Sequence, residues 1–217
     1  MHRLSDMDLR QESRKRRINY HRSPHILIVK IPCVLTEVAI SSFGMLATLF
    51  LCEMGLFWDL LATGAAHVEG SERTKCPYCS YRPFQLPRGR SRKWPSVVVV
   101  ASCSRWCAEH LAEDAKWWLL DSQGEVRMAI TIEIEWERKG IVIDRWETAV
   151  KETSERPVTH VQRVRISAGE DGDPEVIGGP LVLPFENFFL RKPSGNEGDL
   201  KFGNEELAGL AKGVWAF

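Results

Sequence analysis

The stretch that decides the fold is residues 94–120, which read WPSVVVVASCSRWCAEHLAEDAKWWLL. Four consecutive β-branched residues, Val97 to Val100, are typical of a strand that is buried on both faces. Ser102 and Ser104 then offer helix caps, and the pattern from Arg105 to about Leu120 has the period of an amphipathic helix. Its predicted apolar face consists of Cys107, Leu111, Ala115 and Trp118. A buried strand that leads into such a helix is the beginning of an α/β unit.

The sequence after this unit predicts further strands and one more helix. Residues 126–136, 141–146 and 158–166 alternate apolar and polar positions with the period of strands. The turn at 137–140 ends in Gly140, where a positive φ is expected. Residues 176–183 and 185–190 suggest a hairpin-like return, and a closing helix is expected from about Asn204 to Trp215. The predicted fold class is therefore α/β, with a mixed central β-sheet flanked by helices.

The N-terminal part is expected to be organised differently. Residues 1–25 look like a mobile basic arm, and residues 26–69 contain a short strand at 26–35 and a long apolar helix at 36–63, between Thr36 and Gly64. Residues 70–95 are rich in proline and predict an extended connection at the start of the third region, a domain over 70–217.

The long apolar helix is also the one candidate for a membrane span. Its charge-free core, between Glu37 and Glu53, has 15 residues, fewer than the roughly 18 to 20 that a span requires. A packed core helix is therefore favoured. A membrane helix remains the alternative, because small residues at helical spacing would also let two membrane helices approach closely.

Charge is balanced overall but uneven along the 217 residues, which contain 29 Lys and Arg and 29 Asp and Glu. Residues 71–94 contain one acidic residue, Glu72, and the following basic ones: Arg73, Lys75, Arg82, Arg88, Arg90, Arg92 and Lys93. This basic segment is a candidate for contact with DNA or RNA phosphates, and a solvated connector is the alternative. Six cysteines without a secretory start fit an intracellular protein, cytoplasmic or, given the basic run at 14–17, nuclear.

Several motifs together resemble a known family. They are residues 94–100, 113–119, Tyr81-Arg82-Pro83, 144–147, 179–181 and 188–191. With these motifs, about residues 70–217 resemble a fungal family of restriction-endonuclease-like proteins with the PD-(D/E)XK nuclease fold. The resemblance implies a metal-dependent endonuclease in which two carboxylates hold magnesium and a lysine orients the nucleophile.

The two carboxylates expected from this resemblance are absent from the matching positions. The Pro-Asp pair corresponds to Pro77-Tyr78, and the acidic position in the buried strand corresponds to Val100. A neutral phenol and a hydrocarbon are no substitutes for anionic oxygen toward a hard cation. Lys116 is either the remaining catalytic lysine or a solvated helix lysine. The resemblance therefore implies a degenerate, inactive nuclease with residual nucleic-acid binding, or one that acts through a protein partner.

Two other functions remain open. Glu133 and Glu135 lie on the same face of their strand and are candidates for a rerouted magnesium site in a divergent nuclease, whereas the Glu137-Arg138-Lys139 triplet lies in a turn. Alternatively Cys76, Cys79, Cys103 and Cys107 bind zinc, with His110 nearby, in a zinc-stabilised or membrane-attached interaction module. Buried or half-buried thiols without metal are favoured over zinc, because the pair Cys103 and Cys107 begins at a strand end and continues into a helix, unlike the usual two-residue knuckle.

Overall fold

A computed structural model describes residues 17–103, 105–148 and 157–217. Its main sheet has seven strands in the order β11-β10-β9-β8-β7-β6-β3. The strands are β3 (Leu60–Ala62), β6 (Cys79–Pro83), β7 (Val97–Ser102), β8 (Met128–Glu135), β9 (Gly140–Thr148), β10 (Val158–Ala168) and β11 (Pro174–Ile177). Only β7 and β8 pair in parallel among the described strands of this sheet, and α3 (Arg105–Asp121) connects them. The predicted strand–helix unit and the mixed sheet are confirmed.

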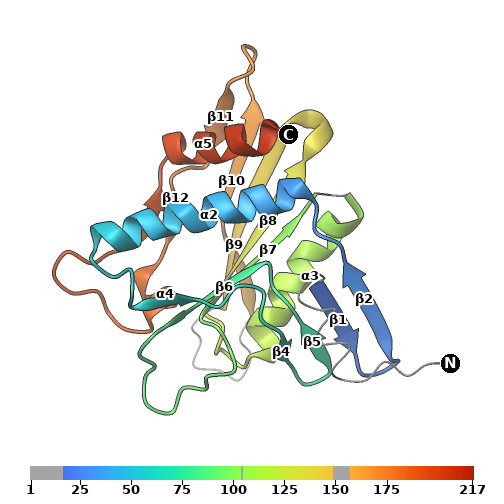
Figure 1. The fold of residues 1–217 in the computed structure, drawn as a ribbon, viewed down its shortest axis with the longest axis vertical. Helices are drawn as coiled ribbons and strands as arrows, with labels where there is room; N and C mark the ends of the chain where they lie inside the picture. The colour runs from blue at the N-terminus through green and yellow to red at the C-terminus, as the bar shows by residue number, and fades with distance from the viewer. Residues whose placement is uncertain (1–16, 104, 149–156) are drawn as a thin grey trace.

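Helices cover both faces of this sheet (Figure 1). The helices α2 (Val34–Glu53) and α5 (Asn204–Trp215) lie side by side across one face, and α3 packs on the other. The side chains of β7 alternate between the two layers. Val97 and Val99 belong to the core cluster under α2 and α5, and Val98 and Val100 belong to the cluster under α3. Four consecutive valines are therefore explained by a strand with an apolar layer on each side.

A second, smaller sheet has the order β2-β1-β5-β4. Its strands are β1 (Arg17–His21), β2 (Ile26–Lys30), β4 (Val68–Glu69) and β5 (Arg73–Lys75). This differs from the expected arm over residues 1–25, because residues 17–21 pair with β2 on one side and with β5 on the other. The other residues of that arm, 1–16, lie outside the described residues. The small sheet also joins residues from both sides of the boundary expected at residue 70.

The long apolar helix is shorter than expected. It begins after Cys33 and ends at Glu53, and the expected helical residues 60–62 form β3 instead. Gly55 has a φ of +73°, a conformation that ends a helix and that other residues rarely adopt. Among the described residues, α2 is the one helix long and apolar enough to cross a membrane, a test that core helices also pass. Its buried side chains, including Phe43 and Ala47, pack in the core beneath α2 and α5.

Three other local expectations are corrected. The left-handed residue of the β8–β9 turn is Lys139, with a φ of +46°, and not Gly140. The turn contains a short 3₁₀ helix, η2 (Trp136–Arg138), which places the backbone reversal one residue earlier. Residues 185–189 form a short helix, α4 (Phe185–Phe189), between β12 (Leu181–Leu183) and β13 (Leu200–Phe202). The expected connection at 70–95 contains two strands, β5 and β6.

Candidate functional site

A cavity of about 1010 Å³ lies between α3 and the small sheet, at the end of β7. One wall is formed by β1, β2 and β5, and the opposite wall by the face of α3 that carries Asp114 and Trp117. Ala101, Ser102 and Cys103 line the end of the cavity where β7 finishes. The cavity therefore uses elements from both the N-terminal region and the domain expected over 70–217.

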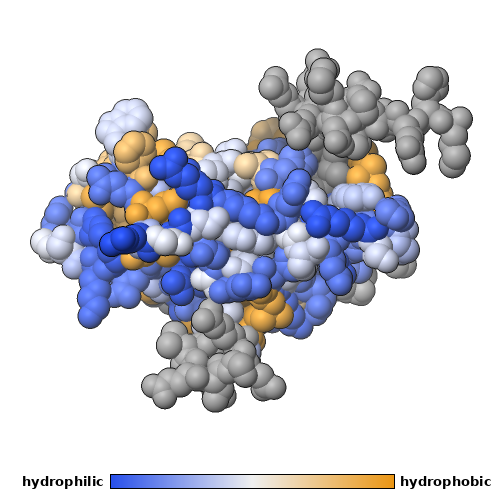
Figure 2. All heavy atoms as spheres, turned by 90° about the horizontal axis from the view of Figure 1, so that it is seen from below, coloured by the Kyte–Doolittle hydropathy of each residue, from blue (hydrophilic) through white to orange (hydrophobic). Residues whose placement is uncertain are grey.

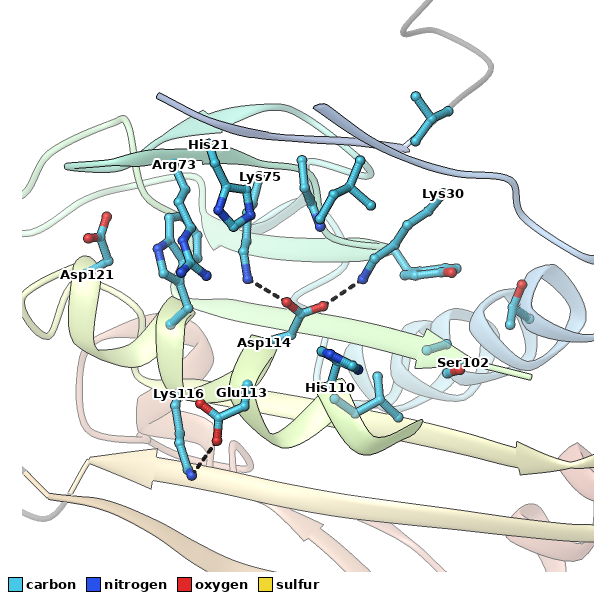
Figure 3. A pocket seen from close by; sticks show the side chains of 18 of the residues that line it. His21, Lys30, Arg73, Lys75, Ser102, His110, Glu113, Asp114, Lys116 and Asp121 are labelled. Carbon is cyan, nitrogen blue, oxygen red and sulfur yellow. Dashed lines mark hydrogen bonds and ion pairs between the residues drawn. The ribbon is translucent and has the colours of Figure 1, made fainter. Parts of the chain in front are cut away.

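The carboxylate of Asp114 is held by two ammonium groups (Figure 3). Lys75 Nζ lies 2.5 Å from Oδ1, and Lys30 Nζ lies 2.7 Å from Oδ2. Burial raises the pKa of Asp114, but the charges of Lys30 and Lys75 outweigh burial and hold it below its ordinary value. Two ammonium groups around one carboxylate leave one positive charge in excess at this end of the cavity.

The small-sheet wall carries one further cation and one imidazole. His21 and Arg73, which are opposite each other in the β1–β5 pair, both line the cavity. Burial, followed by the nearby charges of Arg73 and Lys75, lowers the pKa of His21. The pKa of Lys75 is also lowered, because burial and the charges of Lys30 and Arg73 outweigh its attraction to Asp114. Burial is the main cause of both shifts, and the neighbouring cations of this wall add to it.

The other carboxylates of the cavity are engaged or exposed. Glu113 binds Lys116 at 2.7 Å, on the side of α3 away from the Asp114 group (Figure 3). Asp121 accepts hydrogen bonds from the backbone N–H and hydroxyl of Ser71, and Glu72 is exposed at the rim. Within the described residues, no three His, Cys, Asp or Glu side chains converge as metal ligands do.

The positions that the resemblance assigns to metal binding are only partly brought together. Tyr78 lines the cavity, and its N–H donates to the carbonyl of Val99 at 2.9 Å. Val100 is buried in the apolar cluster of Trp118 and Leu111 and is not among the residues that line the cavity. Both oxygens of Asp114 are engaged by ammonium groups. These residues do not fit a magnesium ion, which takes oxygen ligands that are not already committed to cations.

Sequence reasoning missed Asp114, Lys30 and His21 as cavity residues. One signal for Asp114 was available, because it occupies the i+3 position after Leu111, within the apolar face of α3. A charged residue inside an apolar stripe is rarely left without a partner. Lys116, by contrast, lies at the cavity rim and pairs within its own helix, as a solvated helix lysine does.

Some basic residues of segment 71–94 are held by contacts within the protein or line the cavity, and the others are exposed on one loop. Lys75 and Arg90 are largely buried in ion pairs, Arg90 with Glu125 at 2.8 Å, and Arg82 donates to the carbonyl of Arg92. Arg73 lines the cavity. The remaining exposed cations are Arg88, Arg92 and Lys93, all in the loop after β6, which is lowest in Figure 1. Seen from below, the molecule is mostly hydrophilic, with apolar side chains in small separate groups (Figure 2).

Glu133 and Glu135 line a different hollow, of about 630 Å³, together with Cys103, Ile134 and residues 136–138. Burial and the charge of Glu135 raise the pKa of Glu133, partly offset by Arg163 and Arg165. The two carboxylates are thus close enough to interact, as expected from their spacing along β8. The Glu137-Arg138-Lys139 triplet lies in the exposed turn beside them.

The four cysteines of the zinc hypothesis are dispersed over several elements. The Cys76 thiol donates to the carbonyl of Ala65 at 2.7 Å, Cys79 begins β6, and Cys103 follows β7. The side chain of Cys107 and the predicted cap at Ser104 lie outside the described residues. The zinc site stays a prediction. Cys33 and Cys103 both line the cavity between α3 and the small sheet.

Comparisons with known proteins find a similarity in structure and none in sequence. No family model matches the chain, and no curated protein matches it. Among solved structures, it is similar to a crystal structure described as that of "a putative nuclease belonging to DUF820" from Anabaena variabilis ATCC 29413. The two sequences are 11% identical, the TM-score is 0.49, and the similarity covers 89% of this chain and 90% of that one.

Proposed function

We propose that this protein binds single-stranded nucleic acid through phosphate contacts in the cavity between α3 and the small sheet, without hydrolysing it. The observation that carries the proposal is the Asp114 carboxylate bound by both Lys30 and Lys75. Where a metal-dependent nuclease of the resembled family needs uncommitted carboxylates, this chain has ammonium groups in excess. The charged residues that line the whole cavity balance, four basic against four acidic, so it is the local pair Lys30 and Lys75, together with Arg73, that would attract phosphate without a bridging metal ion.

The size of the cavity and its aromatic lining favour a single strand. A volume of about 1010 Å³ is enough for one or two nucleotides and far too small for a duplex about 20 Å wide. Trp117 and Tyr78 line it, and Lys75 Nζ lies 4.9 Å from the centre of the Trp117 ring. Aromatic faces beside cations are the usual elements of single-strand binding.

The test is binding of fluorescent 20-nucleotide single-stranded DNA, single-stranded RNA and duplex DNA, measured by anisotropy over a salt series. Arg73→Gln should weaken single-strand binding about 3- to 10-fold and reduce the salt slope by about 0.7. The matched control is Lys212→Gln, because Lys212 is an exposed lysine on α5 that pairs with Asp173. No binding, or equal losses in the two variants, would refute the proposal, and so would magnesium-dependent cleavage that persists in Glu133→Gln.

A second candidate function, a divergent metal-dependent nuclease, is favoured by the raised pKa of Glu133 beside Glu135. A divalent cation would reduce the electrostatic repulsion between the two carboxylates. Magnesium bound there would act as a Lewis acid toward a phosphodiester. Cleavage of DNA or RNA in magnesium or manganese that Glu133→Gln abolishes and Glu170→Gln, at an exposed carboxylate outside the hollow, leaves intact would establish this function. Cleavage unaffected by Glu133→Gln would remove it.

A further inference from the structure

Exposed aromatic side chains gather where α2 ends and the chain turns into β3. Trp58 is 82% exposed, and its ring meets that of the exposed Phe57 edge to face, with the ring centres 4.7 Å apart. Phe84, which is 65% exposed, comes directly after β6, and its N–H donates to the carbonyl of Asp59 at 2.8 Å. The turn after α2 and the loop after β6 are therefore neighbours, and both lie toward the lower left of Figure 1.

These rings are exposed although the backbone that carries them is fixed. The N–H of Leu56 donates to the carbonyl of Leu51 in α2 at 2.8 Å, and the N–H of Asp59 donates to the carbonyl of Leu56 at 3.0 Å. Leu56 and Leu60, on either side of the two aromatic residues, are buried. The anchored turn thus presents Trp58 to the outside. Neighbouring exposed apolar side chains, unlike scattered single ones, mark an interaction surface.

The apolar surface continues along the outer side of α2. Met45 and Leu49 are four residues apart, on one side of the helix, and both are exposed. Phe43 and Ala47 of the same helix are buried in the core. One side of α2 is therefore committed to the protein interior, while another side carries aliphatic groups in solvent. Such a helix fits contact with the surface of a membrane and not passage through it.

Exposed cations lie beside the aromatic group, in loop 84–93, which begins with Phe84. The loop contains no Asp or Glu. Arg90 is bound to Glu125, and the exposed cations of the loop are Arg88, Arg92 and Lys93. Arg82 in β6 donates to the carbonyl of Arg92 at 2.8 Å, so the loop returns to the strand that Phe84 follows. The exposed acidic residues of the turn after α2 are Glu53 and Asp59. Cations therefore outnumber carboxylates here.

We propose that the aromatic-basic surface, formed by Phe57, Trp58 and loop 84–93, docks the protein reversibly on an anionic phospholipid surface. Tryptophan is enriched at membrane interfaces, because its ring is apolar and its N–H is polar. Arginine and lysine are attracted to anionic head groups. The exposed aliphatic side chains of Met45 and Leu49 favour lipid over nucleic-acid bases, since bases stack on aromatic rings.

The test is flotation of the full chain with vesicles of phosphatidylcholine alone or with about 30% phosphatidylserine, at low and high salt. The wild-type protein should bind the anionic vesicles at least about 5-fold more tightly than the neutral ones, and more weakly at high salt. Trp58→Ala should weaken binding about 10-fold, and Arg88→Gln about 3- to 5-fold. Because both side chains are exposed, both variants should keep the wild-type thermal midpoint.

The matched controls are Trp136→Ala and Arg138→Gln, at exposed positions of the β8–β9 turn. Strands β7 and β8 are parallel, so this turn, which follows β8, lies at the opposite end of the sheet from loop 84–93, which precedes β7. Both controls should leave vesicle binding unchanged. No binding to the anionic vesicles overturns the inference, as do equal losses in Trp58→Ala and Trp136→Ala.

The outcomes also separate this inference from the proposed function. If the wild-type protein binds no vesicles and Trp58→Ala weakens binding of single-stranded DNA, the aromatic-basic surface contacts bases, and the lipid inference is overturned. If the protein binds no nucleic acid, the proposed function fails, while vesicle binding that is lost in Trp58→Ala and kept in Trp136→Ala still establishes the lipid surface.

Discussion

Lys30 and Asp114 are 84 positions apart in the sequence, and their side chains meet at 2.7 Å. The bond connects β2, the edge strand of the small sheet, to α3, which packs on the main sheet. Lys75 binds the other oxygen of the same carboxylate from β5. One carboxylate thus joins three elements around the cavity.

Replacement of Asp114 by Asn should destabilise the fold strongly. The change leaves Lys30 and Lys75 close together without their shared counter-charge, and Lys75 is only 4% exposed. Removing one member of a buried ion pair typically costs about 3–5 kcal/mol of unfolding free energy, which urea unfolding would measure. Glu113→Gln changes the adjacent, exposed carboxylate of α3 and should leave the midpoint unchanged. Similar effects of the two substitutions would contradict the role given to Asp114.

The stability contributed by Asp144 should depend on pH. Burial raises the pKa of Asp144, but hydrogen bonds from Arg163, at 2.7 and 2.8 Å, and from His160 outweigh it and lower the pKa. A lowered pKa means that the contribution is present above pH about 4 and is lost as pH falls through the folded-state pKa. Asp144→Asn should therefore cost about 1.5–3 kcal/mol at pH 7.

The difference between Asp144→Asn and the wild-type protein should shrink as pH falls toward 3, in denaturant unfolding at several pH values. Asp171→Asn, at an exposed loop position, provides the control and should follow the wild-type protein throughout. A difference that is constant with pH would show that the carboxylate charge is not what matters at position 144.

Gly70→Ala should destabilise the turn between β4 and β5. A methyl group at Gly70 would collide with Asp121 Oδ2 and lie 2.5 Å from Trp117 Cζ2. Either the turn is strained by the methyl group, or Asp121 moves and loses its hydrogen bonds with Ser71. The free energy of unfolding should therefore fall by about 2–3 kcal/mol, as measured by thermal or urea unfolding. Gly209→Ala, within α5 and with no atom within 4 Å of the added carbon, should instead gain up to about 1 kcal/mol. Equal changes in unfolding free energy for Gly70→Ala and Gly209→Ala would mean that the structure accommodates the methyl group at position 70 without strain.

Arg90 and Arg88 should behave in opposite ways, although both belong to the basic segment. Arg90 is buried and bound to Glu125, so Arg90→Gln should lower the unfolding free energy by about 1–3 kcal/mol and leave the salt dependence of nucleic-acid binding unchanged. Arg88 is exposed in the loop after β6, so Arg88→Gln should leave stability unchanged. If a bound nucleic-acid strand extends from the cavity to this loop, Arg88→Gln should also reduce the salt dependence of nucleic-acid binding. An unchanged salt dependence would mean that the nucleic acid contacts the cavity alone.

The elements predicted from sequence are those whose signals are local. The strand at Val97–Ser102, the helix after it and the closing helix at Asn204–Trp215 have uninterrupted apolar patterns of a single period. The apolar run after Glu53 was assigned to a helix, because a short apolar run fits a helix or a buried strand equally well. Residues 60–62 form the strand β3 because they pair with β6. The local sequence of the run does not determine that pairing.

The cavity was harder to predict because its parts have no common local pattern. Tyr78, Arg73, Lys75 and Lys116 were all singled out from the sequence and all line it. Their arrangement around Asp114 depends on the small sheet, whose strands β1 and β5 are short, with pairing set by tertiary contacts. The role of Lys75 as the partner of a buried carboxylate, rather than as an exposed phosphate contact, follows from that arrangement.

The position of β1 between β2 and β5 has a consequence for synthesis of the chain. The hairpin of β1 and β2 is complete early, yet its second neighbour, β5, is more than 40 residues further along, and Asp114 is later still. On the ribosome, Lys30 must therefore wait for α3 to emerge before it meets Asp114, and the edge strand Ile26–Lys30, whose residues 26–29 are exposed even in the folded protein, is not anchored to α3 until then. The growing chain is most prone to edge-to-edge association in that interval, which ends once α3 has left the ribosome and Asp114 can bind Lys30.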